Sequence, residues 1–211
     1  METVIGDAAS SVRSLILQLR IPVLRGCRVG LARSALALSA FQVLSLISQA
    51  QETRPTEAQV KAAYIYNFGK FIRRSSDRGA LPDPFQICIL GKDPFGPVLD
   101  STVAGETIEG KRITVNRLPS LQGVGQCGML FIGASEEGRL APILATALRL
   151  NVPTVSDIRN FADRGGVIGL VKQQDRIRFE VNLNAADQSH LVLSSELVKV
   201  ATKVIGQQAR K

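Results

Sequence analysis

Cysteine supplies the most predictable chemistry in this sequence, through the pair Cys88 and Cys127. A third cysteine, Cys27, lies in a leader segment that we expect to be removed. An even pair of cysteines in an oxidising compartment most often forms a disulfide, and two buried free thiols are the alternative. A zinc site is not expected, because two cysteines and the single histidine, His190, provide too few ligands.

A row of charged residues in "DRIRFEVNL" is the second group that could do chemistry. Arg176, Arg178 and Glu180 are two positions apart, so on a strand all three side chains project from one face. The apolar residues between them fill the opposite face. Such a row is either a solvated surface or a binding face for an acidic ligand or partner, and the residues alone leave both interpretations open.

The usual catalytic motifs are missing from the sequence. It contains no G-x-S-x-G, H-E-x-x-H, P-loop or EF-hand pattern, so we expect no enzyme activity, no cofactor and no metal site. The alternative is a small-ligand receptor or enzyme with its site at the carboxyl ends of the strands, near Gly91, Ser135 and Ser156. Gly91 opens "GKDPFG", a place where α/β sheets can hold phosphates, but a turn and a helix cap explain this segment better.

An aromatic helix precedes the first strand, in "VKAAYIYNFGKFIRR" at residues 60–74. Thr56 and Gln59 form a capping box, and the helix is predicted to run to about residue 73. Tyr64 and Phe68 lie on its 3.6-residue apolar stripe, which is wider than a single face. Either both sides of this helix belong to the core, or one side is free for self-association or a partner. Tyr64 and Phe68 are therefore candidate partner-binding residues.

Strands and helices alternate along the rest of the chain. Strands are predicted at 85–91, 111–118, 128–134 and 152–157, with a hairpin over 167–183. Helices are predicted at 93–105 with Asp93 as cap, at 135–150 with Ser135 as cap, at 158–166 and at 194–206. This order predicts an α/β fold with a mainly parallel sheet, helices on both faces as in Rossmann-like folds, and an antiparallel edge hairpin. First and third strands of such sheets are commonly neighbours, which would bring Cys88 close to Cys127.

The charge of the chain suggests nucleic-acid binding at first sight. The formal charge is +8 and the isoelectric point is about 9.9. Residues 1–50 hold five arginines and two acidic residues, which leaves 21 basic and 16 acidic residues in the remainder. Those charges are interspersed, which is typical of a solvated surface, so we expect no nucleic-acid partner.

The first fifty residues are predicted to be an export signal with a long n-region. Arginines precede "SALALSAFQVLSLI" at 34–47, which is free of charges, and "SQA" at 48–50 places small residues where a signal peptidase cuts, between Ala50 and Gln51. A fourteen-residue helix spans about 21 Å, less than a hydrocarbon core of roughly 30 Å. A membrane anchor or a buried core helix is the alternative. We therefore expect a periplasmic protein without stable membrane insertion after cleavage.

The chain is thus predicted to hold one folded unit between short ends. We expect a leader at 51–55, a single α/β domain at 56–206 and a tail at 207–211. No internal repeat, low-complexity tract or linker follows residue 55.

Several segments taken together resemble the YfiR-like proteins. They are "VKAAYIYNFGKFI", "FQICILGKDPFG", "GMLFIGASEEGRL", "TVSDIRNFADRGGVIGLV" and "RIRFEVNLNAADQSHLVLSSELVKVA". The resemblance covers roughly residues 56–205 and implies a small exported α/β protein. Its pattern also places one cysteine in the first strand and one just before the third, which matches Cys88 and Cys127.

The resemblance also implies a function. YfiR-like proteins include periplasmic repressors that bind the sensing part of an inner-membrane diguanylate cyclase and keep it inactive. We therefore expect a non-catalytic repressor that lowers cyclic-di-GMP, with a diguanylate cyclase or another membrane sensor protein as partner. A repressor of this kind could also associate with itself as a homodimer.

Overall fold

The computed structural model describes residues 54–75 and 82–207 of the chain. The predicted export signal, its cleavage site and Cys27 lie outside the described residues. The described residues belong to one compact unit that begins at Arg54.

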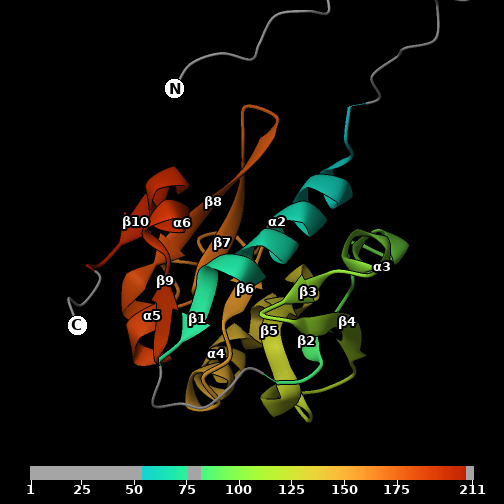
Figure 1. The fold of residues 1–211 in the computed structure, drawn as a ribbon. Helices are drawn as coiled ribbons and strands as arrows, with labels where there is room; N and C mark the ends of the chain where they lie inside the picture. The colour runs from blue at the N-terminus through green and yellow to red at the C-terminus, as the bar shows by residue number, and fades with distance from the viewer. Residues whose placement is uncertain (1–53, 76–81, 208–211) are drawn as a thin grey trace, which may run out of the picture. The chain divides into compact units, whose positions relative to one another are not determined.

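An eight-stranded sheet forms the centre of the molecule (Figure 1), in the order β10-β8-β7-β6-β5-β2-β4-β3. Its strands in chain order are β2 (Phe85–Leu90), β3 (Thr107–Ile108), β4 (Lys111–Leu118), β5 (Cys127–Ile132), β6 (Thr154–Ser156), β7 (Ile168–Gln173), β8 (Arg176–Asn182) and β10 (Lys203–Ile205). Neighbouring strands from β4 to β7 are parallel, and the β7–β8 and β3–β4 pairs are antiparallel. The predicted mainly parallel α/β sheet with its hairpin is confirmed.

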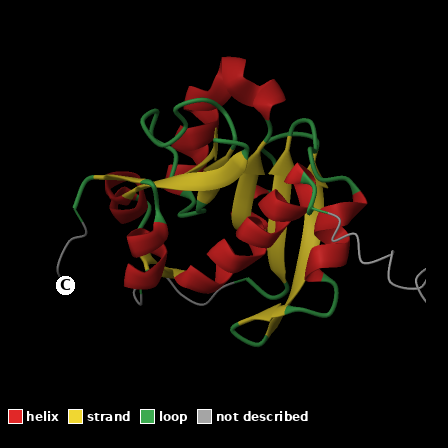
Figure 2. Ribbon diagram, turned by 90° about the horizontal axis from the view of Figure 1, so that it is seen from above, coloured by secondary structure: helices red, strands yellow, loops and turns green. Residues whose placement is uncertain are grey.

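Helices cover both faces of this sheet (Figure 2). They are α2 (Glu57–Phe71), α3 (Pro97–Val103), α4 (Leu140–Arg149), α5 (Leu183–Gln188) and α6 (Ser195–Val200). Along β2, Ile87 and Ile89 belong to the core cluster that includes α2 and α3, whereas Cys88 and Leu90 belong to the cluster that includes α4. This alternation follows from the two-residue period of a strand and shows that β2 is buried on both faces.

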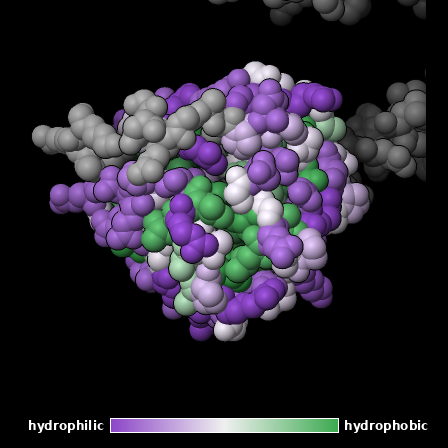
Figure 3. All heavy atoms as spheres, turned by 90° about the horizontal axis from the view of Figure 1, so that it is seen from below, coloured by the Kyte–Doolittle hydropathy of each residue, from purple (hydrophilic) through white to green (hydrophobic). Residues whose placement is uncertain are grey.

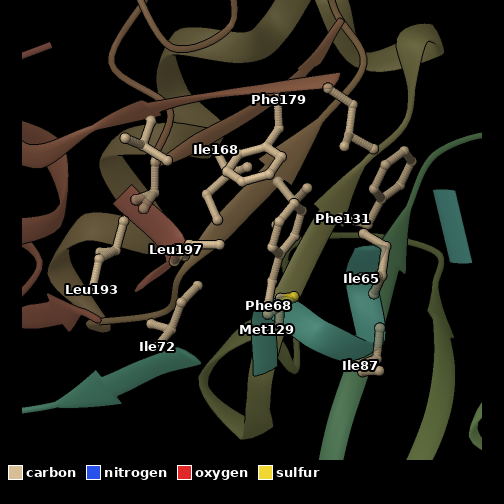
Figure 4. Close-up of a cluster of buried hydrophobic side chains, with 14 of the residues drawn as sticks. Ile65, Phe68, Ile72, Ile87, Met129, Phe131, Ile168, Phe179, Leu193 and Leu197 are labelled. Carbon is tan, nitrogen blue, oxygen red and sulfur yellow. The ribbon is translucent and has the colours of Figure 1, made fainter. Parts of the chain in front are cut away.

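The main core lies between α2 and the sheet (Figure 4). Phe68 of α2 and Phe179 of β8 meet edge to face, with ring centroids 5.0 Å apart. Phe95, in the turn between β2 and α3, makes a similar pair with Phe131 of β5 at 4.8 Å. Aromatic pairs in this geometry stabilise a core beyond the area they bury.

A second, two-stranded sheet was not predicted from the sequence. It joins β1 (Ile72–Arg74), directly after α2, to β9 (Leu191–Leu193) in antiparallel register. Hydrogen bonds from Ser194 N–H to the Phe71 carbonyl and from Ser75 N–H to the His190 carbonyl extend the pairing. The end of the first helix is therefore held by residues near the end of the chain.

Two predicted helix starts are wrong. α3 begins at Pro97, not Pro94, because the Asp93 carboxylate accepts the N–H groups of Phe95 and Gly96 and closes a turn instead. The segment after β5 first forms the 3-10 helix η3 (Ala134–Arg139), and α4 follows it. Ser135 does not cap that helix, since its hydroxyl accepts the Lys92 N–H.

Two further helix predictions also need correction. Residues 158–166 form consecutive turns, with Arg164 N–H bonded to the carbonyls of Asn160 and Phe161, and not a helix. The predicted helix at 194–206 ends at Val200, after which the chain forms β10. The Thr202 N–H and hydroxyl both donate to the Phe179 carbonyl, and this turns the chain onto the edge of β8. The hairpin is therefore not outermost, because β10 lies outside it.

Candidate functional site

Strand β8 has one charged face and one apolar face, as predicted. Arg176 and Arg178 are exposed and Glu180 is half-buried, whereas the residues between them are buried in the core. Within the described part of the chain, no carboxylate forms an ion pair with Arg176 or Arg178. The row therefore presents two arginines that face solvent without a partner.

The first part of β8 also has an open edge. β10 pairs only with residues 180–182, so among the described residues no strand pairs with residues 176–178 on the side away from β7. The Ile177 carbonyl points to this side, where it accepts the hydroxyl of Tyr64 at 3.2 Å. The edge of β8 thus faces the helix α2.

A groove lies between this edge, the β7–β8 hairpin and the start of α2. Figure 1 shows the hairpin extending past the other strands at the end of the molecule where α2 begins. The groove has a volume of about 810 Å³. Its lining comes from residues 54–60 on one side and residues 172–178 on the other, with Val60 and Ile177 among the apolar contributors.

Two carboxylates in the groove are balanced by lysines. Lys172 Nζ lies 3.8 Å from the Glu57 carboxylate and 3.6 Å from the Asp175 carboxylate. Glu57 also meets Lys61 at 2.7 Å, and the hydrogen bond from Lys61 lowers the pKa of Glu57 below its ordinary value. Arg54, like the two arginines of β8, has no ion-pair partner in the described residues. The groove therefore carries surplus positive charge.

Helix α2 forms one wall of the groove, and two sets of interactions near its start hold it in place. The first is the predicted capping box, in which Thr56 Oγ1 accepts the Gln59 N–H at 3.3 Å and Gln59 Oε1 accepts the Thr56 N–H at 2.7 Å. The second is an ion pair between buried Lys61 and Asp157, at 2.6 Å.

The Lys61 ion pair connects α2 to the end of β6. Burial lowers the pKa of Lys61, but the hydrogen bonds to Asp157 and Glu57 outweigh that effect and raise the pKa above its ordinary value. Asp157 Oδ1 is buried and has no hydrogen-bond partner. Sequence reasoning missed this pair; the available signal was a lysine inside an otherwise apolar helix stripe.

The candidate partner residues of α2 are core residues. Phe68 is 1% exposed and packs on Phe179, as Figure 4 shows, so the proposal that its side chain contacts a partner is wrong. Tyr64 is half-buried, stacks on Phe68 at 5.6 Å and donates its hydroxyl to β8. The wide apolar stripe is explained by contact with the sheet on one side and with α3 and α6 beside the helix.

The structure contains the expected disulfide between Cys88 and Cys127. The two residues lie on the adjacent strands β2 and β5, with Cα atoms 5.8 Å apart. Both are fully buried in the core cluster that includes α4. The bridge therefore joins two neighbouring inner strands inside the core and is not part of the exposed surface.

Arg74, at the end of β1, is a further cation that sequence reasoning did not single out. Its guanidinium donates to the Cys127 carbonyl at 3.3 Å, and its Nε is buried without a partner. Burial lowers the pKa of Arg74. This side chain therefore links the small sheet to the start of β5 beside the disulfide.

Of the three residues predicted at the carboxyl ends of the strands, the structure brings Gly91 and Ser135 together, and Ser156 bonds elsewhere. Ser135 Oγ accepts the Lys92 N–H at 2.8 Å and fills the space above Gly91, where a Cβ would lie 2.5 Å from it. Ser156 is fully buried, and its hydroxyl donates to the Ile132 carbonyl at 2.7 Å. A hollow of about 130 Å³ beside them is lined by Lys92, Pro94, Ala134, Ser135 and Asp157. The Ser156 hydroxyl is therefore closed to a ligand, whereas exposed Ser135 is engaged as an acceptor of the Lys92 N–H.

An apolar depression lies on another part of the surface, between α4 and α5. Its volume is about 250 Å³, and Leu148 in its lining is 38% exposed. Figure 3, seen from below, shows hydrophobic side chains at the surface within a hydrophilic rim. Self-association of the chain stays a prediction.

Two general features concern metals and membranes. The described residues hold no group of three His, Cys, Asp or Glu side chains placed to bind a metal ion. Over residues 54–75 and 82–207, no helix combines the length and the apolar character that crossing a bilayer requires.

Comparison with known protein families gives a match over most of the chain. The family model described as YfiR/HmsC-like matches residues 58–202. A search of curated proteins found no match. Two solved structures are similar at 11% identity: the ABC domain in complex with L-Trp from Streptococcus pneumonia (TM-score 0.43, 57% of this chain and 55% of that one), and a conserved domain protein from Vibrio cholerae O1 biovar eltor (TM-score 0.47, 72% and 61%). This chain spans less than two thirds of either.

Proposed function

This chain belongs to the YfiR/HmsC-like family, and on that premise we propose that it is an exported, non-catalytic regulatory protein. It binds an inner-membrane signalling enzyme, a diguanylate cyclase, holds it inactive and thereby lowers cyclic-di-GMP. The family match over residues 58–202 is the observation that carries this proposal. The partner class is inferred from the family alone.

The surface of β8 supports a role in binding another protein. Arg176 and Arg178 are exposed and have no ion-pair partner among residues 54–75 and 82–207, and they stand on a strand whose other face is fixed in the core. Arginine is enriched at protein interfaces because its planar guanidinium pairs with carboxylates through two hydrogen bonds. We assign Arg176, Arg178 and Glu180 as contact residues for the membrane sensor.

The arrangement of the strand ends favours binding over catalysis. Ser135 and Ser156, the hydroxyls nearest to the place where α/β enzymes act, are both engaged in loop hydrogen bonds. A nucleophile needs a base within hydrogen-bond reach, and neither serine bonds to a histidine.

Deletion of the gene tests the proposed function. Loss of a repressor should raise cyclic-di-GMP and surface attachment, and Arg178→Glu should partly reproduce the deletion. Arg112→Glu is the matched control, because Arg112 is exposed on β4, which β2, β5, β6 and β7 separate from β8. A deletion strain with unchanged cyclic-di-GMP would remove the cyclase partner. A folded Arg178→Glu variant that represses normally would remove only the contact assignment.

Export is tested on the protein itself. The mass of the chain recovered from a periplasmic extract should correspond to a start near Gln51. Recovery with residues 1–50 intact would contradict the proposed export. Co-purification of the tagged protein with solubilised inner membrane should retain the sensor enzyme, which mass spectrometry can then identify.

A further inference from the structure

We propose that the groove between the start of α2 and the β7–β8 hairpin binds an extended acidic segment of polypeptide. Arg54, Arg176 and Arg178 would hold the carboxylates of this segment. The inference deepens the proposed function and rests on it in one respect, since the segment would belong to the sensor protein.

Charge is the first argument. The carboxylates of Glu57 and Asp175 already lie near Lys172, whereas the three arginines of the groove have no ion-pair partner in the described residues. Carboxylates recognised by arginine form charge-assisted bonds that are shorter and stronger than neutral ones. An acidic occupant would therefore complete pairs that the chain itself leaves open.

Spacing is the second argument. Arg176 and Arg178 are two positions apart on a strand, so their Cα atoms are separated by about 7 Å. Acidic residues at alternate positions of an extended segment have the same separation. The apolar residues between them would face the floor of the groove, where Val60 and Ile177 lie.

The open edge of β8 is the third argument. The Ile177 carbonyl points away from β7, and in an antiparallel pair the N–H of the same residue points to the same side. The Ile177 N–H therefore faces the groove where no described strand pairs with it, while the Ile177 carbonyl beside it already accepts the Tyr64 hydroxyl. A peptide that adds to a sheet edge gains main-chain hydrogen bonds, and the side chains at alternate positions give specificity.

The hairpin tip argues against an anionic membrane as the occupant. The tip is the turn at Gln174 and Asp175, both with positive φ, and the Asp175 side chain is 97% exposed. An anionic surface that approached this end would meet Asp175 before the arginines behind it. A segment of polypeptide can lie inside the groove and avoid that repulsion.

The test is a binding assay with defined probes on the chain purified from a periplasmic extract. Fluorescence anisotropy is followed for a labelled eight-residue peptide in which Glu and Val alternate. Comparison probes are the same peptide with Lys in place of Glu, the Glu–Val peptide N-methylated at alternate residues, and vesicles of phosphatidylglycerol. Variants are Arg176→Glu with Arg178→Glu, and Arg112→Glu as control, each checked for folding by its thermal unfolding.

We expect the Glu–Val peptide to bind and the Lys–Val and N-methylated peptides to bind more weakly. The double variant should weaken binding at least about tenfold, with Arg112→Glu unchanged and affinity falling as salt rises. Equal binding of the Glu and Lys peptides, or an unchanged affinity in the folded double variant, would overturn the proposal. Arginine-dependent binding to vesicles without binding to the peptide would overturn it in favour of a membrane surface.

The assay contains no sensor protein, so its outcome is independent of the proposed function. Failure of peptide binding in a chain whose deletion still raises cyclic-di-GMP would reject the groove alone. Peptide binding in a chain whose deletion leaves cyclic-di-GMP unchanged would support the groove and reject the cyclase.

Discussion

Lys61 Nζ lies 2.6 Å from Asp157 Oδ2, and this contact joins residues 96 positions apart. It fastens the first half of α2 to the loop that follows β6 and so sets the position of one wall of the groove. Lys61 is buried among apolar residues, and a buried cation without a counter-charge would be costly. The pair therefore specifies where the helix sits on the sheet.

Replacing Lys61 by Met should destabilise the fold. The substitution keeps most of the volume but leaves the Asp157 carboxylate without its cation. Because the Asp157 side chain is 19% exposed, we expect a loss of about 2–3 kcal/mol, below the roughly 3–5 kcal/mol of a fully buried pair. Urea unfolding measures the loss. Glu57→Gln is the control and should cost less than about 1 kcal/mol, since Glu57 is exposed. Equal losses in the two variants would contradict the role of Asp157.

Removing the disulfide should also lower stability. Cys88 and Cys127 are 39 positions apart, and closing a loop of this length stabilises a fold by about 3–4 kcal/mol in the chain-entropy model. The double variant Cys88→Ala with Cys127→Ala should unfold at lower temperature than the parent chain, and reductant should lower the unfolding temperature of the parent only. Titration of two free thiols in the native parent would show that the bridge is absent.

Substitution by alanine should lower the stability of the fold strongly at one position of β8 and hardly at the position next to it. Phe179→Ala removes a ring that is 3% exposed and packs on Phe68 and Tyr64, so we expect a loss of about 3–5 kcal/mol. Arg178→Ala removes an exposed side chain and should change the free energy of unfolding by less than about 0.5 kcal/mol. Chemical denaturation measures both. A large loss in Arg178→Ala would mean that this residue supports the fold, which would disqualify it as a contact probe.

Stability should fall in acid partly through Asp100. Hydrogen bonds from Arg117 lower the pKa of Asp100, so the pair stabilises the fold above the ordinary pKa of Asp100 and is lost as pH falls through the lowered one. Arg117→Ala should cost less than about 1 kcal/mol at pH 7, since both side chains are partly exposed, and the difference should shrink as pH falls through the lowered pKa of Asp100, leaving the Arg117 bond to the Gly96 carbonyl. Urea unfolding at several pH values measures it. Arg112→Ala, on the same strand, should show no such dependence.

The alternation of residues predicted much of the fold. The side chains of β8 alternate between the core, where Ile177 and Phe179 lie, and the surface, where the arginines lie. This is the two-residue period of a strand, and it can be recognised without tertiary information. The neighbouring positions of Cys88 and Cys127 followed from the usual strand order of such sheets. These features depend on local pattern or on general topology.

Other features depend on contacts between distant residues and were not predicted. β10 exists because Thr202 bonds to the Phe179 carbonyl, and residues 203–205 have no strand pattern of their own. The sequence pattern predicts Asp93 as a helix cap, but Asp93 closes a turn, and Arg117 Nε donates to its carboxylate at 2.9 Å. For Phe68 the pattern showed a wide apolar helix, and only the packing of Phe179 decided that the residue is core.

The pairing of β1 with β9 has a consequence for how an exported chain acquires its structure. A chain that crosses a membrane through a narrow channel, amino end first, delivers α2 and β1 at the start and β9 near the finish. Residues 72–74 have no strand partner until residues 191–193 have crossed, and the part of α2 that packs on β8 and α6 stays uncovered for most of that time, whereas α3 can cover another part earlier. Contacts of such long sequence separation form slowly. On the proposed export route, the complete fold thus becomes accessible only when translocation is nearly over, and until then the uncovered part of α2 is available to a periplasmic chaperone.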